Sequence, residues 1–163
     1  MSRSVMRAIC LEDVAQIYDF CQRLKEEHAR MSFTDVETEA EVEAWLEDPS
    51  IYAFGTFEAS GVLTGLLRAK RGQGNKAHSV YLAAAVHPEY RKRNIAKELT
   101  LFALEILKGE GVKIARTYIY SWNKASIATI EKCGFTYGGS VVMHEYDPVT
   151  EAYIDDLIYH KVL

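Results

Sequence analysis

The chain has 163 residues, of which 48% are hydrophobic and 26% are charged, and its formal net charge is −4. A chain of this length and composition can bury a full hydrophobic core, so we expect one globular domain over residues 1–163. The negative charge argues against general nucleic-acid binding, and the longest plainly apolar run, residues 80–86, is too short to cross a membrane.

The cysteines and histidines indicate neither a disulfide framework nor a metal site. Cys10, Cys21 and Cys133 are odd in number and share no CxxC spacing, and the five histidines form no ligand motif. Residues 1–14 also lack the continuous apolar segment that an export signal needs. We therefore expect reduced thiols in a cytoplasmic protein without a metal, and Cys133 as a packed core thiol rather than a nucleophile.

The first half of the chain predicts one strand, two helices and then three strands. Residues 5–9 favour a strand, and the apolar positions after it repeat with helical spacing. Residues 38–47 predict a second helix, which Pro49 ends. The helical stripe consists of Leu11, Val14, Ile17, Cys21 and Leu24. The three strands are expected at residues 51–57, 62–69 and 77–86, separated by short glycine-containing turns.

Three consecutive cations, Arg91, Lys92 and Arg93, precede the next amphipathic helix, which is expected to end at Gly109 and Gly111. Cations at a helix N-terminus oppose the helix dipole, at a cost of roughly 0.3–1 kcal/mol each. An anion bound to the free N–H groups of the first turn would reverse that penalty. The clustered charge therefore predicts an anionic ligand at this turn.

The second half of the chain continues the alternation of strands and helices. Residues 113–120 predict a strand, Asn123 can cap a short helix that runs through Cys133, and a final hairpin is expected at residues 135–146 and 152–161. This order implies an α/β sheet with antiparallel hairpins and one βαβ crossover around the cationic turn. Open α/β sheets bind anionic ligands at such a place, beyond the carboxyl end of a strand.

Two segments carry a resemblance to a known family. "VHPEYRKRNIAKEL" matches a strand that ends near Val-x-Pro and is followed by Arg/Gln-x-x-Gly-x-Gly/Ala, with Arg91, Asn94 and Ala96 at the pattern positions. Further on, "NKASIATIEKCGF" matches an Asn, a short helix and a Glu-Lys-x-Gly-Phe ending. Because both segments occur in the right order and at the right distance, the chain resembles the GNAT superfamily of N-acetyltransferases over nearly its whole length.

The resemblance implies a single-domain α/β fold, with a mixed central sheet of about seven strands, splayed middle strands and about four helices. It implies acetyl-coenzyme A as cosubstrate, no metal, and direct attack by a primary amine in a ternary complex without an acyl-enzyme. The amine belongs to a small molecule or a peptide N-terminus; nucleic acid and membrane are not expected partners, and a homodimer stays open. The residues implied to bind the coenzyme are Ala84, Ala85, Val86, Arg91, Lys92, Arg93, Asn94, Ile95, Ala96, Lys97, Asn123, Ser126 and Ile130.

Two departures from the family pattern concern the coenzyme side. Asn94 stands where the family prefers glycine; since Asn tolerates the left-handed backbone and is also a good N-cap, we expect the turn to persist. Residues 82–86, "LAAAV", are rich in alanine for a strand, which either a pantetheine arm lying in the splay or close helix packing would explain. A free N–H of Val86 or Ala85 is expected to hold the thioester oxyanion.

A third departure concerns catalysis. Ile130 occupies the place of the tyrosine that protonates the leaving thiolate in many relatives, and Tyr118 occupies the place of a glutamate. His87 and Tyr118 are left as candidate catalytic residues, although the first can equally be an exposed loop residue and the second a packing residue. Tyr118 and Tyr120 are expected to face opposite sides of their strand, so that at most one of them reaches the cleft. The missing acid leaves open an alternative function, a non-catalytic acyl-CoA-binding sensor or regulatory module.

The acceptor is not identified by the sequence. Residues 28–37, between the first two helices, match the region that shapes the acceptor side in the family. Asp35 and Glu37 in this segment either attract a cationic amine or are simply solvated.

Overall fold

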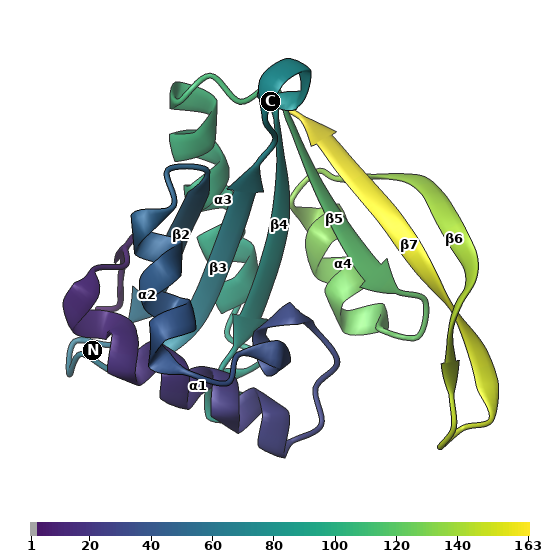
Figure 1. Cartoon of the computed structure of the whole chain (residues 1–163), viewed down its shortest axis with the longest axis horizontal. Coiled ribbons are helices and arrows are strands. Elements are labelled where there is room, and N and C mark those ends of the chain that lie inside the picture. The colour runs from purple at the N-terminus through teal and green to yellow at the C-terminus, as the bar shows by residue number, and fades with distance from the viewer. Residues whose placement is uncertain (1–2) are drawn as a thin grey trace.

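One mixed sheet of seven strands, in the order β1-β2-β3-β4-β5-β7-β6, forms the centre of the protein (Figure 1). The computed structural model describes residues 3–163. The strands are β1 (Val5–Ala8), β2 (Ile51–Phe57), β3 (Leu63–Arg71), β4 (Ser79–Val86), β5 (Ile114–Tyr120), β6 (Thr136–Asp147) and β7 (Ala152–Val162). The helices are α1 (Val14–Glu26), α2 (Glu39–Glu47), α3 (Ile95–Gly109) and α4 (Lys124–Lys132).

The connections follow the predicted topology. Every neighbouring pair of strands is antiparallel except β4 and β5, which are parallel and joined by α3. The expected βαβ crossover around the cationic turn is therefore confirmed, as is the mixed sheet of seven strands with four helices.

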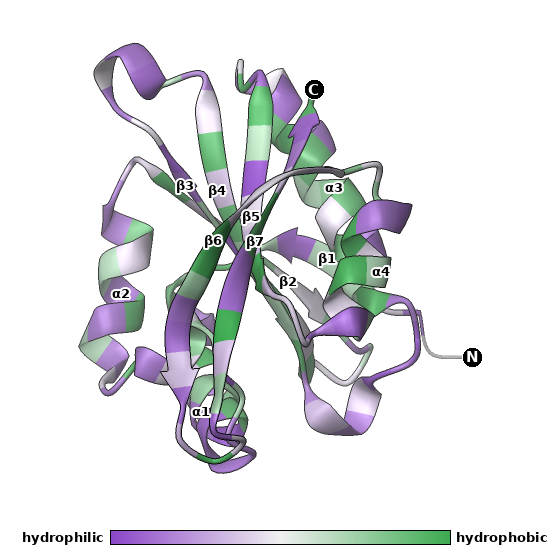
Figure 2. Ribbon diagram, turned by 90° about the vertical axis from the view of Figure 1, so that its right-hand side faces the viewer, coloured by the Kyte–Doolittle hydropathy of each residue, from purple (hydrophilic) through white to green (hydrophobic). Residues whose placement is uncertain are grey.

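Two helices cover each face of the sheet, with α1 and α2 on one side and α3 and α4 on the other (Figure 2). The central strand β3 is apolar on both faces for this reason. Its consecutive residues Leu66 and Leu67 are both fully buried, and they pack into the two different cores. Full burial of one such side chain stabilises the fold by roughly 1.5–3 kcal/mol.

The predicted boundaries agree with the structure to within three residues. Leu11–Asp13 form a 3-10 turn before α1, because the Asp13 carboxylate accepts hydrogen bonds from Arg7 at 2.7 Å and from the Cys10 N–H at 2.8 Å. β4 begins at Ser79 rather than at Ala77, because a 3-10 turn occupies the residues before it.

The far ends of β6 and β7 extend past β5 as a two-stranded arm (Figure 1). Its exposed apolar side chains include Val142, Met143 and Tyr153. Within residues 3–163, no helix combines the length and the apolar character needed to cross a bilayer.

Candidate active site

A gap between β4 and β5 opens the middle of the sheet. The two strands pair only over Ser79–Tyr81 of β4 and Ile114–Arg116 of β5. Beyond these residues they diverge toward their carboxyl ends, as Figure 1 shows. The predicted splay of the middle strands is therefore confirmed.

Two hydrogen bonds fix the direction of the β4 peptide groups at this gap. Thr117 of β5 donates from Oγ1 to the carbonyl of Leu82 at 3.1 Å, so the backbone carbonyl of Leu82 points toward β5. The N–H of His87 donates to the carbonyl of Thr64 on β3 at 2.8 Å, so the backbone N–H of His87 points toward β3, away from β5. The peptide groups of successive residues in a strand point to opposite neighbouring strands. The two bonds therefore also fix the direction in which the peptide groups of residues 83–86 point.

Ala84 and Val86 face the gap by this alternation. Ala85 lies opposite Leu66 and directs its peptide groups to β3. Of the two expected oxyanion donors, Val86 therefore presents its N–H to the gap and Ala85 does not. Ala84, which the resemblance placed among the coenzyme-binding residues, presents a second N–H there.

The turn from β4 to α3 contains two residues in the left-handed region, Lys92 with φ 64° and Asn94 with φ 59°. Asn94 is the N-cap residue of α3, but its side chain forms no hydrogen bond to the helix. The expected left-handed backbone is confirmed, whereas the expected side-chain capping is wrong. Glycine adopts this conformation at the least cost, which is the physical reason why glycine is the preferred residue at this position.

The first turn of α3 presents free backbone donors. The first bond of the helical ladder runs from the Glu98 N–H to the Asn94 carbonyl at 3.0 Å. The N–H groups of Ile95, Ala96 and Lys97 lie ahead of this bond and have no acceptor within the helix. Together with the positive end of the helix dipole, they form an anion-binding surface.

A glycine on β3 allows α3 to start close to the sheet. Gly65 lies opposite Val86 at the end of β4. A Cβ atom at Gly65 would lie 2.6 Å from Cγ2 of Ile95, well inside van der Waals contact. Ile95 therefore packs directly on Gly65, and a side chain there would push the start of α3 away from the gap.

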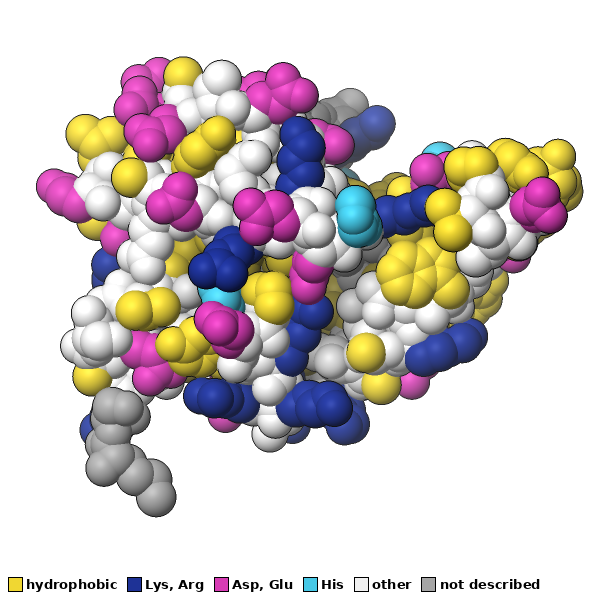
Figure 3. Space-filling model, turned by 90° about the horizontal axis from the view of Figure 1, so that it is seen from below, with side chains coloured by type: hydrophobic (Ala, Val, Ile, Leu, Met, Phe, Trp, Pro, Cys, Tyr) yellow, Lys and Arg dark blue, Asp and Glu magenta, His cyan; other side chains and the backbone are white. Residues whose placement is uncertain are grey.

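The cations of the turn have different partners. Arg91 forms an ion pair with Glu27 at the end of α1, and the guanidinium of Arg93 lies 5.0 Å from the centre of the Tyr90 ring. Lys92 forms no ion pair with any of residues 3–163. Figure 3 views the molecule from below and shows several Lys and Arg side chains close together on that face.

Helix α4 lies on the α3 face of the sheet and contributes mainly packing. Asn123 accepts a hydrogen bond from the Ser126 N–H at 3.2 Å, which confirms the predicted cap. Ile130 is 8% exposed and belongs to the core under α3. Burial raises the pKa of Cys133, whose Sγ lies 3.8 Å from the carbonyl of Lys97, so Cys133 has the character of a packed thiol.

His87 lies at the end of β4, as predicted, and is held by its neighbours. Its ring packs against Phe20 of α1 and Tyr90 of the turn, at centroid distances of 6.2 and 5.4 Å. Its Nδ1 accepts a hydrogen bond from the N–H of Glu89 at 3.2 Å. This contact favours the neutral tautomer that carries its hydrogen on Nε2, so the ring can take up a proton only at Nδ1, after Nδ1 has released the Glu89 N–H.

Tyr118 lies on the same face of the sheet as α1 and α2, but in the part formed by β5 and β7, where its side chain is exposed. We call this part of the sheet the open face. The ring of Tyr118 packs on Tyr81 at a centroid distance of 5.1 Å, and both rings are 42% exposed. Ala115 and Ile119 of β5 point to the opposite core. The expectation that Tyr118 and Tyr120 face opposite sides is wrong, because strand residues two positions apart share a face.

Asp156 is a candidate functional residue that the sequence analysis missed. It lies opposite Tyr120 in the β5–β7 register and therefore points to the same open face. Burial raises the pKa of Asp156, and the nearby Glu145 raises it further, whereas His144 lowers it. Burial also raises the pKa of Tyr120 to about 12, with a contribution from the carboxylate of Glu145.

An ion pair joins the two sides of this open face. Arg30, in the segment after α1, donates to Asp147 at the end of β6 at 2.9 Å. The segment between α1 and α2 therefore borders the open face next to the β6–β7 arm, where the resemblance placed the acceptor side.

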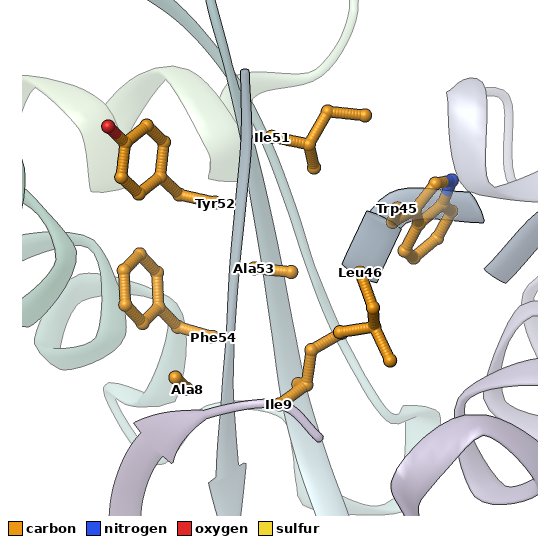
Figure 4. A pocket seen from close by; sticks show the side chains of 8 residues that line it. All are labelled: Ala8, Ile9, Trp45, Leu46, Ile51, Tyr52, Ala53 and Phe54. Atoms are coloured by element: carbon orange, nitrogen blue, oxygen red, sulfur yellow. The ribbon is translucent and has the colours of Figure 1, made fainter. Parts of the chain in front are cut away.

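A separate apolar pocket of about 200 Å³ lies along β2, near the β1 edge of the sheet and away from the gap (Figure 4). Trp45, Leu46 and Ile9 line it on one side of the strand, and Phe54 and Tyr52 lie on the other. It contains no acid or base apart from the Tyr52 hydroxyl, so it offers no chemistry. No group of three metal-ligating side chains occurs within residues 3–163.

The model of one protein family, the acetyltransferase (GNAT) family, matches residues 11–135 of the chain. The chain belongs to this family. Members of this family transfer an acetyl group from acetyl-CoA, a cosubstrate with phosphate groups of the kind expected at the α3 turn. A curated relative, mycothiol acetyltransferase from Streptomyces coelicolor, is 31% identical over 105 residues, which are 64% of this chain and only 31% of that protein.

Solved structures share the fold of this GNAT chain over almost its whole length. A GNAT acetyltransferase from Streptococcus pneumoniae has a TM-score of 0.89 at 20% identity, and the match covers 99% of this chain and 100% of that one. An acetyltransferase described as putative, from Salmonella typhimurium and solved with its cofactor acetyl-CoA, has a TM-score of 0.86 at 19% identity, with 98% and 94% covered.

The residues of this GNAT chain fit acetyl-CoA. The free amides of Ile95, Ala96 and Lys97 suit a diphosphate, and the unpaired peptide groups of Ala84 and Val86 suit an extended arm with amide groups. Strand alternation in "AYIDDLIYHKV" could have identified Asp156 in advance, because it places one of the two aspartates on each face of β7.

Proposed function

We propose that this GNAT protein transfers the acetyl group of acetyl-CoA to a primary amine, by direct attack within a ternary complex and without an acyl-enzyme. The observation that carries the proposal is the opening between β4 and β5, which the N–H of Val86 faces and beyond which the free amides of α3 lie. The pKa of Cys133 is raised and its thiol is buried against α3, which argues against an acyl-cysteine.

The coenzyme is held mainly by backbone groups in this proposal. The amides of Ile95, Ala96 and Lys97 bind the pyrophosphate, and the cations Lys92 and Arg93 add charge attraction. Arg91 joins them by exchanging its Glu27 partner for phosphate. The N–H of Ala84 pairs with the pantetheine arm, which lies in the gap.

The N–H of Val86 stabilises the negative charge that develops on the thioester oxygen. A donor fixed in a strand needs no reorganisation during the reaction, and loss of one such donor typically costs about 100- to 1000-fold in rate. Orientation of the two substrates by the gap supplies a further large part of the acceleration.

Proton transfer is assigned to the open face. Asp156 is the base that we propose for the ammonium group of the acceptor, because burial raises its pKa and because it lies on the face from which the amine approaches. His87 is the second candidate base, through Nδ1 once this atom has released the N–H of Glu89. Tyr118 remains the candidate acid for the leaving thiolate, and Tyr120 shares its face.

An acetyl-CoA turnover assay against a panel of primary amines tests the proposal, with thermal shift by coenzyme A as the parallel binding measurement. Both signals are expected: a higher melting temperature, because the coenzyme binds only the folded protein, and release of free thiol that depends on the amine. A thermal shift without turnover for any amine would favour the acyl-CoA sensor. No thermal shift at millimolar coenzyme A would contradict both functions.

A cytoplasmic location, a small-molecule or peptide amine as partner, and homodimer formation stay predictions. The location rests on three unpaired cysteines, two of them buried.

A further inference from the structure

A second pocket, of about 620 Å³, opens on the same face as Tyr118, at the end of the sheet opposite the α3 turn. Tyr81 and Tyr118 form the wall nearest the gap, and Lys70, Lys76 and Arg116 supply positive charge. The pocket is therefore cationic although the whole chain carries a net charge of −4.

The strand register explains how these cations come together. Lys70 lies opposite Tyr81, Tyr81 lies opposite Arg116, and Arg116 lies opposite His160. Directly opposed residues share one face of a sheet. The four side chains thus form a row across β3, β4, β5 and β7, at the last β4–β5 pair before the strands diverge.

The lysines and Arg116 of the pocket have no anionic partner within residues 3–163. Neither Lys70, Lys76 nor Arg116 takes part in an ion pair. Lys70 contributes to the lowered pKa of Asp48, after the hydrogen bonds from Ser50, but lies beyond ion-pair distance from it. Arg71, also in the pocket, is occupied by the carbonyl groups of Ala77 and Glu110.

Arg68 adds a positive charge one step closer to the gap. It lies on the same face as Lys70, two residues away on β3, and its guanidinium stacks over the rings of Trp45 and Phe33 at 4.7 and 5.3 Å. Among residues 3–163, its guanidinium donates a hydrogen bond only to the hydroxyl of Ser32, at 3.1 Å, and burial lowers its pKa. Asp35 is near enough to raise the pKa of Arg68 but forms no ion pair with it, so this half-buried guanidinium is still available to an anionic ligand.

We infer that the acceptor is a primary amine that also carries an anionic group, a carboxylate or a phosphonate, held by Arg116 and Lys70 while its amine faces the gap. This inference rests on the proposed function. Along β5, Arg116 lies four residues before Tyr120, which is opposite Asp156, so the strands separate the cationic row from the proposed base by about 13 Å. The long side chains of Arg116 and Lys70 span part of this distance, and the acceptor spans the rest. An acceptor without an anionic group would leave Arg116 and Lys70 without an ionic partner.

The test compares matched amines at fixed acetyl-CoA: glycine against glycinamide, and 2-aminoethylphosphonate against ethanolamine. The anionic member of at least one pair is expected to have the higher kcat/KM, and the pair that shows it distinguishes a carboxylate from a phosphonate. Arg116→Gln and Lys70→Gln are each expected to raise the KM of that anionic amine about tenfold, with kcat changed less.

Lys113→Gln is the matched control, because Lys113 is an exposed cation three residues before Arg116 and outside the pocket. It is expected to leave the preference for the anionic amine unchanged. Equal kcat/KM for both members of both pairs, or the same loss in Lys113→Gln as in Arg116→Gln, would overturn the inference.

A binding measurement covers the case in which no panel amine is acetylated. Inorganic phosphate is titrated into protein saturated with coenzyme A, and the side-chain Nε–H resonance of Arg116 is followed by NMR. A saturable shift that Lys70→Gln weakens supports the anion site, and no shift contradicts it. Saturation by coenzyme A is itself observed in this experiment, so failure of the anion site is distinguished from failure of coenzyme binding.

Discussion

The two sides of the β4–β5 gap are built differently. On the coenzyme side, the functional groups are mostly peptide N–H groups of one local segment, residues 84–97. On the acceptor side they are side chains from strands far apart in the chain, such as Lys70, Tyr118 and Asp156. A local backbone site is specified by a short motif, whereas a site of side chains exists only when the sheet is assembled.

Asp156→Asn is expected to have the largest effect, because it removes the proposed base without changing the shape of the side chain. The loss in kcat is expected to be about 100- to 10,000-fold, while coenzyme affinity stays unchanged. The parent kcat/KM should fall as the pH drops through the raised pKa of Asp156, since a base acts in its deprotonated form, and the variant should lose this dependence. Rate measurements across pH test both points.

Asp155→Asn is the control for this variant. Asp155 accepts a hydrogen bond from the Met143 N–H at 2.8 Å, and the amide oxygen of Asn can still accept it. Equal losses in the two variants, or an unchanged pH profile in Asp156→Asn, would show that Asp156 is not the base. His87→Gln would then be the next variant to measure.

Gly65→Ala tests the coenzyme side by displacing the start of α3. The added Cβ lies 2.6 Å from Ile95, so coenzyme affinity is expected to fall about tenfold, and overpacking costs roughly 1–3 kcal/mol of stability. Calorimetric titration with coenzyme A measures the affinity. Gly109→Ala, where nothing lies within 4 Å of the new Cβ, should keep the parent affinity. An unchanged affinity in Gly65→Ala would mean that the start of α3 does not position the coenzyme.

Tyr118→Phe distinguishes proton transfer from packing on the acceptor side. A loss of about tenfold to a hundredfold in kcat is expected if the hydroxyl protonates the thiolate, with the melting temperature unchanged. Tyr120→Phe is the matched comparison, because both residues lie on the open face. If only Tyr120→Phe lowers kcat, the acid is Tyr120, whose pKa of about 12 keeps it protonated.

Asn94→Gly is expected to have the smallest effect. The Asn94 side chain forms no capping bond, so its loss removes nothing from α3, and glycine relieves the left-handed strain. Thermal unfolding should show equal or slightly higher stability, whereas Asn94→Ala should lose about 1 kcal/mol. A clear loss of coenzyme affinity in Asn94→Gly would show that the Asn side chain contacts the ligand.

The sequence predicted the fold and the coenzyme side more fully than the acceptor side for the same physical reason. Helical spacing, caps and glycines are local signals, so the elements, the Asn123 cap and the left-handed turn could be predicted. The choice of Val86 over Ala85 needed the β3–β4 register, which no local pattern contains. Lys70 and Arg116 are separated by dozens of residues in the chain and become neighbours only through Tyr81 of β4.

Amide hydrogen exchange with and without coenzyme A tests most directly the claim that backbone groups of β4 and α3 bind the coenzyme. The amides of Ala84, Val86 and Ile95–Lys97 are expected to become protected when coenzyme A saturates the protein. Ala85 should not change, because its N–H already pairs with β3. Saturation without protection at Val86 and the start of α3, or protection at Ala85 in place of Val86, would contradict this account.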